Sequence, residues 1–415
     1  MWRRYGDALY TLITFGLFGF ETIALGGLSL AFLLGRTSRI VSTPLEAVLF
    51  AVVTSTASAL ALLGLYLLVY HFVSALRDRW HEERLDAWTE RWITLALADA
   101  TTQEAAGAGP AQRRLPPAAV EAVLRLLEAV KGEEGDRLKA VLADHQVDRA
   151  MLRRLRAGHL AARLDAIEGL GRARLPQALD ALLELLKHPR QVIRRMAIRA
   201  AAGTLAIMPQ EPGQNEARAK FIQALKQTTL RAGVIQEALL LLETRAGPVL
   251  RDMLDEPDLS DSLRWVVLET IGRLGLADMA GDVAASLTHQ DPELRAAALR
   301  ALHRLSTVPD TAQRQLLDSL GDEVDFVRIQ AAHASAFVPA ETALPALWPL
   351  LEDDSWWVRR AAAGAMARLG DDGVETVKRA ARTHKDEAAR DMAVQILLEA
   401  GELDPAGARL VKGVA

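Results

Sequence analysis

Arginine and histidine side chains recur at helical spacing in the C-terminal half of the chain, where they could recognise anions. Guanidinium groups bind carboxylates and phosphates through paired hydrogen bonds. The acids concentrate just before these helices, at 291–293, 322–325 and 352–354. This pattern predicts a basic groove, although helix capping and solvation would produce it too. With a tryptophan pair in one turn added, the expected protein-binding residues are Arg300, His303, Arg304, His333, Trp356, Trp357, Arg360 and Arg368.

Motifs for catalysis are missing from the sequence. It has no phosphate loop, GxGxxG fingerprint or GxSxG elbow, and HEERL at 81–85 lacks the second histidine of a zinc-protease helix. The absence of cysteine excludes disulfides, thiolate metal sites and a cysteine nucleophile. We therefore expect no catalytic residue, no cofactor and no metal. An enzyme, or a nucleotide or phosphate sensor that uses the basic groove, is the alternative.

Charge and hydrophobicity are distributed unevenly along the 415 residues. Lys and Arg total 49 against 53 Asp and Glu, a balance that argues against nucleic-acid binding. Residues 8–34 carry only Glu21, and residues 47–73 carry no charge apart from His71. About 20 helical residues cross a bilayer core, so we expect a transmembrane hairpin over 1–75, with helices at about 8–34 and 45–73.

A carboxylate at the centre of the first run needs a polar partner, because an exposed charge in lipid is costly. On a helical wheel, Glu21 and Thr14 lie opposite a cluster of glycines, and the second helix offers a seam of small residues to those glycines. Glu21 and Thr14 are thus expected to contact an integral membrane subunit or a second copy of the chain, as in a homo-oligomer. The alternative is a hydrogen bond inside the hairpin, from Glu21 to Thr54 or Ser58.

The segment 76–98 is expected to be an amphipathic helix beside the membrane. Trp80, Trp88 and Trp92 fall on one helical face. They either anchor this helix in the membrane interface or pack on the soluble domain. Residues 99–116 are expected to be a linker and residues 404–415 a tail.

A repeat of about 31 residues organises the segment 117–403. A helix that begins with an apolar–arginine pair recurs at Arg163, Arg194, Arg264, Arg295, Arg328, Arg359 and Arg390, with a degenerate copy around Ile235. Alanines in these helices, such as Ala331, Ala332, Ala361 and Ala362, permit close packing. We expect each arginine to pair with acids of the preceding turn, as Asp354 could for Arg359.

This unit resembles the HEAT repeats, in particular the short bacterial ones also seen in phycobilisome-lyase-type proteins. The resemblance implies antiparallel helix pairs stacked into an α-solenoid whose second helices line the concave face. The fold class is therefore all-α, a transmembrane hairpin followed by a solenoid. HEAT-like deoxyhypusine hydroxylases carry repeated His-Glu pairs that bind iron, whereas this chain has only His81-Glu82.

The two tryptophans before Arg359 have two interpretations. Only one of Trp356 and Trp357 is expected to reach the core beside Val358, which leaves the other as an interface anchor. Alternatively, both cover the neighbouring repeat.

The distribution of arginines predicts the topology. Arginines flank the hairpin at residues 3–4 and 77–91, and only Arg36 and Arg39 lie in its loop. The positive-inside rule then places both termini and the solenoid in the cytoplasm of a bacterium, with the hairpin in the inner membrane. Together these features predict a membrane-tethered scaffold for a cytoplasmic protein partner, such as an accessory subunit of a glycosyltransferase-based exopolysaccharide synthase.

Overall fold

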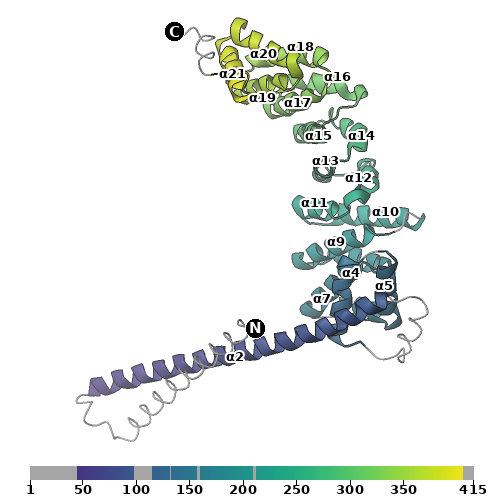
Figure 1. Cartoon of the computed structure of the whole chain (residues 1–415), viewed down its shortest axis with the longest axis vertical. Coiled ribbons are helices and arrows are strands. Elements are labelled where there is room, and N and C mark those ends of the chain that lie inside the picture. Colours follow the sequence, from purple (N-terminus) through teal and green to yellow (C-terminus); the bar gives the residue numbers. More distant parts are fainter. Residues whose placement is uncertain (1–43, 98–114, 131, 157–158, 209–211, 405–415) are drawn as a thin grey trace. The chain divides into compact units, whose positions relative to one another are not determined.

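The second hydrophobic segment and the tryptophan-rich segment after it form one helix (Figure 1). The computed structural model describes residues 44–97, 115–130, 132–156, 159–208 and 212–404. Helix α2, Pro44–Leu97, runs for 54 residues, whereas the sequence predicts two segments that meet near residue 75. No glycine or proline lies between 65 and 97, so nothing in the backbone ends the helix where the apolar run stops.

Large apolar side chains in the first half of α2 are exposed, among them Leu60, Tyr66 and Val73. Of the helices in the described ranges, α2 alone is long and apolar enough to cross a membrane, on grounds of length and composition. The predicted first hairpin helix, with Glu21 and Thr14, lies outside the described residues. The hairpin therefore remains a prediction.

The second half of α2 packs on helix α4, Pro117–Ala129. Leu85, Trp92 and Ala96 are buried on one face of α2, and the Trp92 indole nitrogen donates a hydrogen bond to the Ala119 carbonyl at 2.9 Å. Arg137 of helix α5, Glu133–Asp144, donates to the Ala96 carbonyl at 2.9 Å, which satisfies one of the free carbonyls at the end of α2. Helices α2 and α4 and the part of α5 up to Val141 belong to the first compact unit.

The second compact unit begins at Leu142 and consists of helix pairs joined by short turns (Figure 1). It opens with α6, Val147–Leu155. The second helices of the pairs are α7 Leu160–Ala173, α9 Gln191–Leu205, α11 Ala232–Leu240, α13 Asp261–Leu274, α15 Pro292–Leu305, α17 Asp325–Ala334, α19 Trp356–Ala367 and α21 Glu387–Glu399. The first helices are α8 Leu179–Glu184, α10 Pro212–Gln227, α12 Ala246–Leu254, α14 Ala280–Ala284, α16 Asp310–Asp318, α18 Ala340–Leu347 and α20 Gly370–Thr383. Short 3-10 turns complete the pairs: η1 Pro176–Ala178, η2 Leu185–Lys187, η3 Glu243–Arg245, η4 Ala277–Met279, η5 Ser319–Gly321, η6 Ser335–Phe337 and η7 Trp348–Glu352.

The second helices stack in chain order, each on the next, from α7 to α21. Every predicted start of a second helix, including the degenerate copy at Ile235, lies within one of them. Ala331, Ala332 and Ala362 are fully buried between neighbours. A Cβ atom at Gly272 would lie 3.0 Å from the Ala301 Cα atom, so glycine permits the close approach of α13 and α15. These contacts confirm the all-α repeat solenoid.

The recurring arginine at the fourth position of these helices binds the turn before its own helix, and in two repeats, at Arg295 and Arg328, it also binds the next repeat. In α17, Arg328 Nη1 donates to the carbonyls of Asp322 and Glu323 at 2.8 and 3.3 Å. Its Nε and Nη2 atoms bind the Asp353 carboxylate in the following turn at 2.8 and 3.0 Å. We call this residue the capping arginine. The same pair of carbonyl bonds is made by Arg194, Arg295, Arg359 and Arg390.

The predicted pairing of Arg359 with the Asp354 carboxylate is wrong. Arg359 Nη1 donates to the backbone carbonyls of Asp353 and Asp354 instead, at 2.6 and 3.2 Å. A guanidinium that lies along the turn donates to these backbone carbonyls, so any carboxylate that it binds belongs to the next repeat. The buried Nε atom of Arg359 has no partner, because His384 occupies the place that Asp353 occupies one repeat earlier.

Candidate functional site

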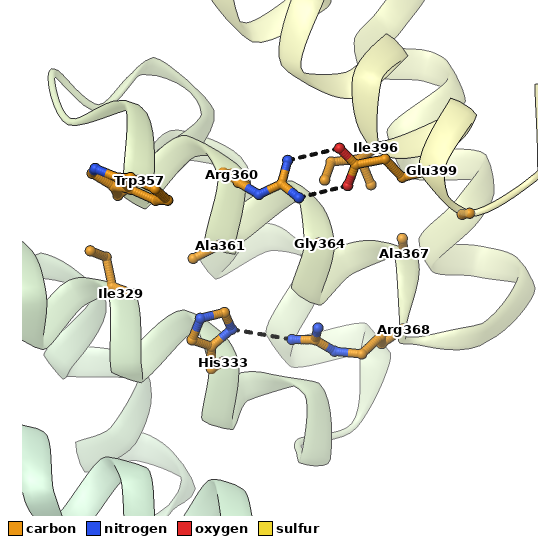
Figure 2. Close-up of a pocket in the computed structure, with 11 residues that line it drawn as sticks. Ile329, His333, Trp357, Arg360, Ala361, Gly364, Ala367, Arg368, Ile396 and Glu399 are labelled. Atoms are coloured by element: carbon orange, nitrogen blue, oxygen red, sulfur yellow. Dashed lines mark hydrogen bonds and ion pairs between the residues drawn. The ribbon is translucent and has the colours of Figure 1, made fainter.

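A hollow of about 480 Å³ opens between α17, α19 and α21 (Figure 2). It exists because α19 presents small residues there, Ala361, Gly364 and Ala367. A Cβ atom at Gly364 would come no nearer than 3.9 Å to the Ile396 side chain, so the space is not already filled by neighbours. The hollow is also lined by Ile329, His333, Trp357, Arg360, Arg368, Ile396, Glu399 and Ala400.

One wall of the hollow is an ion pair between α19 and α21. The Arg360 guanidinium donates to both oxygens of the Glu399 carboxylate, at 3.0 and 2.7 Å (Figure 2). This contact raises the pKa of Arg360 and lowers the pKa of Glu399. The pair is partly exposed to solvent, so it contributes little net stability. It leaves Arg360 without a free charge for a partner.

Trp356 and Trp357 both remain at the surface, with 40% and 63% of each residue exposed. Their rings meet edge to face, with centroids 4.7 Å apart, and the Arg360 guanidinium lies 5.5 Å from the Trp356 ring centroid. Only Val358 enters the core. The prediction that one tryptophan reaches the core beside Val358 is therefore wrong, and Trp357 stands at the rim of the hollow.

Opposite this pair, Arg368 faces His333 of α17 (Figure 2). The Arg368 Nη2 atom lies 3.4 Å from the His333 Nδ1 atom. The His303 Nδ1 atom lies 3.1 Å from the His333 carbonyl oxygen, and the two imidazole rings are 5.7 Å apart. Burial, together with the charges of Arg368 and His303, lowers the pKa of His333 to about 4. Burial also lowers the pKa of His303 and the pKa of Arg368. At neutral pH the two histidines are neutral, whereas Arg368 keeps its charge.

The other two predicted arginines are engaged with an acid that the sequence reading missed. Arg300 Nε and Arg304 Nη1 of α15 bind the two oxygens of the Glu269 carboxylate on α13, at 2.7 and 2.5 Å. Glu269 is 6% exposed. Burial alone would raise the pKa of Glu269, but hydrogen bonds from Arg304 and Arg300 outweigh it and lower the pKa.

The expected basic groove is therefore less basic than its arginine count suggests. Arg199 of α9 is also paired, with Glu237 of α11 at 3.2 Å. Glu237, Glu269 and Glu399 lie on α11, α13 and α21, outside the helices that carry the arginines of the predicted groove. All three glutamates bind an arginine of a neighbouring second helix, and such a pairing could be predicted from sequence only by aligning the helices position by position.

The three tryptophans of α2 have different environments. Trp92 is buried and hydrogen-bonded to α4, and Trp88 stacks on it with ring centroids 5.5 Å apart. Trp80 is 65% exposed. Packing on the chain itself thus accounts for Trp92 and Trp88, while Trp80 stays available as an interface anchor.

The lining residues of the hollow determine which chemistry it can offer. Among the described residues no group of three His, Asp or Glu side chains is placed to hold a metal ion. His333 is the one imidazole among the lining residues and lies beside Arg368, while the Glu399 carboxylate is held by Arg360. The hollow offers one uncompensated positive charge, a neutral imidazole and an apolar surface.

Comparison with known proteins supports the repeat architecture. A family model described as HEAT repeats matches residues 247–336, 282–366, 314–398 and 344–414. No curated protein matches the chain.

Similar solved structures are repeat proteins of low sequence identity. One is an engineered protein from a structural genomics consortium, 19% identical over 77% of this chain and 95% of that chain, with a TM-score of 0.33. Another is YibA from Escherichia coli, 13% identical over 69% of this chain and 98% of that one, with a TM-score of 0.35. A third is a designed armadillo repeat protein in complex with the peptide (KR)4, 18% identical over 53% of this chain and 98% of that one, with a TM-score of 0.29. Over residues 247–414, this chain is therefore similar to proteins of the HEAT-repeat family.

Proposed function

We propose that the chain is a non-catalytic scaffold that binds a protein partner on the groove side of its C-terminal HEAT repeats. The observation that carries the proposal is the hollow between α17, α19 and α21, with the exposed Trp357 at its rim. Exposed tryptophans beside a recess are common anchors of protein interfaces. A row of stacked second helices offers a continuous surface for such a partner.

We further propose that α2 tethers this scaffold to a bacterial inner membrane, with the repeats in the cytoplasm. The exposed apolar side chains of its first half would be covered by lipid and by the hairpin helix predicted over 8–34. Because α2 continues into the half that packs on α4, the membrane segment and the first soluble helix would share one rigid element. Glu21 and Thr14 would contact an integral membrane subunit there.

An accessory role in an envelope complex, such as an exopolysaccharide synthase built around a membrane glycosyltransferase, fits a tethered scaffold. Purification of the full-length chain from native membranes in mild detergent, with mass spectrometry of the proteins that accompany it, tests this. We expect a membrane glycosyltransferase among them. A different class of membrane partner would remove the exopolysaccharide proposal and keep the scaffold.

A matched pair of variants tests the groove itself. Trp357 is the second residue of α19, and the exposed Val192 is the second residue of α9. Loss of a hot-spot tryptophan costs about 2 kcal/mol or more, so Trp357→Ala should lose the soluble partner and Val192→Ala should keep it. If Trp357→Ala retains the same partners as the wild type, the groove is not the binding surface.

A further inference from the structure

Several arginines on the second helices of the described repeats meet a carboxylate on the neighbouring second helix, although Arg273 meets the Gln236 amide instead. Arg199 meets Glu237, Arg360 meets Glu399, and Arg300 and Arg304 share Glu269. Arg368 departs from this pattern. Among the residues that the structure describes, no carboxylate forms an ion pair with Arg368, and burial lowers the pKa of Arg368.

The surroundings of Arg368 can be compared with those of Arg304, which occupies the equivalent position two repeats earlier. Glu269 is the ninth residue of α13, and Arg304 lies twelve residues after the first residue of α15. His333 is the ninth residue of α17, and Arg368 lies twelve residues after the first residue of α19. His333 thus faces Arg368 as Glu269 faces Arg304, but without the negative charge.

A second difference between the two repeats leaves space beside His333. The ninth residue of α15 is Arg300, which shares the Glu269 carboxylate, whereas the ninth residue of α19 is Gly364. The volume of a long side chain is therefore missing at the same place as the carboxylate. The hollow between α17 and α19 has the size and the unpaired cation that a carboxylate from outside would complete.

We propose that this hollow binds an aspartate or glutamate side chain of the protein partner, flanked by aliphatic residues. The carboxylate would lie beside Arg368 and take the part that Glu269 plays toward Arg304. If Nδ1 of the neutral His333 accepts from Arg368, its proton is on Nε2, which gives a second donor. The aliphatic flanks would cover Ala361, Ala367 and Ile396. This inference rests on the proposed scaffold function and names the chemistry of the partner.

A carboxylate fits this site better than a phosphate group. Phosphate sites gather several cations or the backbone N–H groups of a helix N-terminus. Here one free arginine stands beside a neutral imidazole, and α17, α19 and α21 present their sides to the hollow (Figure 2). One charge-assisted contact on an apolar surface suits an acidic side chain within an aliphatic segment.

Two dye-labelled synthetic peptides test the proposal, Ac-Ala-Leu-Glu-Leu-Ala and its counterpart with Gln in place of Glu. Fluorescence anisotropy with the full-length chain measures their binding. We expect the Glu peptide to bind about tenfold more tightly, because one charge-assisted hydrogen bond separates the two. Equal binding of both peptides, or binding of neither, would overturn the proposal.

Four variants locate the effect. Arg368→Gln should remove the preference for Glu, whereas Arg304→Gln, at the equivalent position but paired with Glu269, should keep it. His333→Glu should abolish the preference by supplying the carboxylate within the chain, whereas His333→Gln, which adds no charge but alters the second donor, should weaken the preference without abolishing it. Helicity measured by circular dichroism checks that each variant is folded. A preference that survives Arg368→Gln contradicts the assignment.

Competition separates this site from a small-anion site. Inorganic phosphate that displaces the Glu peptide at concentrations where acetate does not would show a phosphate site and overturn the proposal. The carboxylate inference and the scaffold function can fail independently. If the native partner still depends on Trp357 while the peptides show no preference for Glu, the scaffold function stands and only the carboxylate inference is lost.

Discussion

Replacing Arg295 with alanine should weaken the repeat stack far more than the same change at Arg359. Arg295 Nη1 donates to the carbonyls of His289 and Gln290, both at 2.9 Å. Its Nε and Nη2 atoms bind the Asp322 carboxylate at 2.7 and 3.0 Å. The side chains of Arg295 and Asp322 are only 13% and 9% exposed. Arg359 makes the carbonyl bonds alone and leaves its Nε unpaired.

The magnitudes follow from these contacts. Removal of one partner of a buried ion pair costs about 3–5 kcal/mol, so we expect a local loss of about 3 kcal/mol for Arg295→Ala because its pair keeps slight exposure. The carbonyl bonds of Arg359 should be worth about 1–2 kcal/mol. The difference of about 1–2 kcal/mol measures the contribution of the carboxylate contact between repeats.

Hydrogen exchange followed by mass spectrometry measures this locally, because repeat arrays open in segments. Arg295→Ala should speed amide exchange in the first turns of α15 and α17 by about a hundredfold, as about 3 kcal/mol implies, with α9 unchanged. Arg359→Ala should speed exchange in α19 by about tenfold. Equal effects of the two variants would refute the idea that the Asp322 carboxylate staples the repeats.

Three further outcomes follow from single contacts. A Cβ atom at Gly373 would lie 1.9 Å from a backbone oxygen of α19, so Gly373→Ala should lower the free energy of unfolding by about 1–3 kcal/mol, while Gly364→Ala, with ordinary contacts, should not; urea unfolding compares them. Trp92→Phe should lose the bond to the Ala119 carbonyl and speed hydrogen exchange in α4 by about fivefold, as about 1 kcal/mol implies. Burial alone would raise the pKa of Asp322, but hydrogen bonds from Arg295 and a backbone amide outweigh burial and lower the pKa. The contribution of the Asp322 carboxylate to the free energy of unfolding is therefore present above the unfolded pKa of about 4 and is lost as the pH falls through the lower folded pKa. Asp322→Asn should lack this pH-dependent contribution when unfolding is compared at neutral and acidic pH.

The repeat was predictable because each unit repeats its own signals in phase. An apolar residue and an arginine open every well-formed second helix, and alanine supplies the close contacts, as Ala331 and Ala362 do. These signals are local in sequence, so single-chain reading finds them.

The pairing of the groove arginines was not predictable in this way. Glu269 binds Arg300 and Arg304 across 31 and 35 residues, and the contact depends on which side of α13 faces α15. Counting acids per helix misses one buried carboxylate that neutralises two arginines. The hollow likewise follows from Gly364, which matters only because of what surrounds it.

The C-terminal end of α2 could not be predicted from hydropathy. Charges begin at Arg77 and mark the end of the apolar run, but a helix ends through its backbone. Without glycine or proline after Gly64, helical hydrogen bonding continues to Leu97. Contacts with α4 begin at about His81, whose Nε2 atom lies 2.9 Å from the Glu121 carboxylate, and their position depends on tertiary structure.

Site-specific photo-crosslinking at position 357 tests most directly whether the groove of the C-terminal repeats holds a protein partner. A benzophenone amino acid that replaces Trp357 in the full-length chain, in the cells that produce it, keeps an aromatic side chain at the rim of the hollow. The same group at Val192, the equivalent exposed position of α9, is the control. We expect a discrete crosslinked protein from position 357 and none of that size from position 192. No adduct at 357, or identical adducts at both positions, would contradict the account.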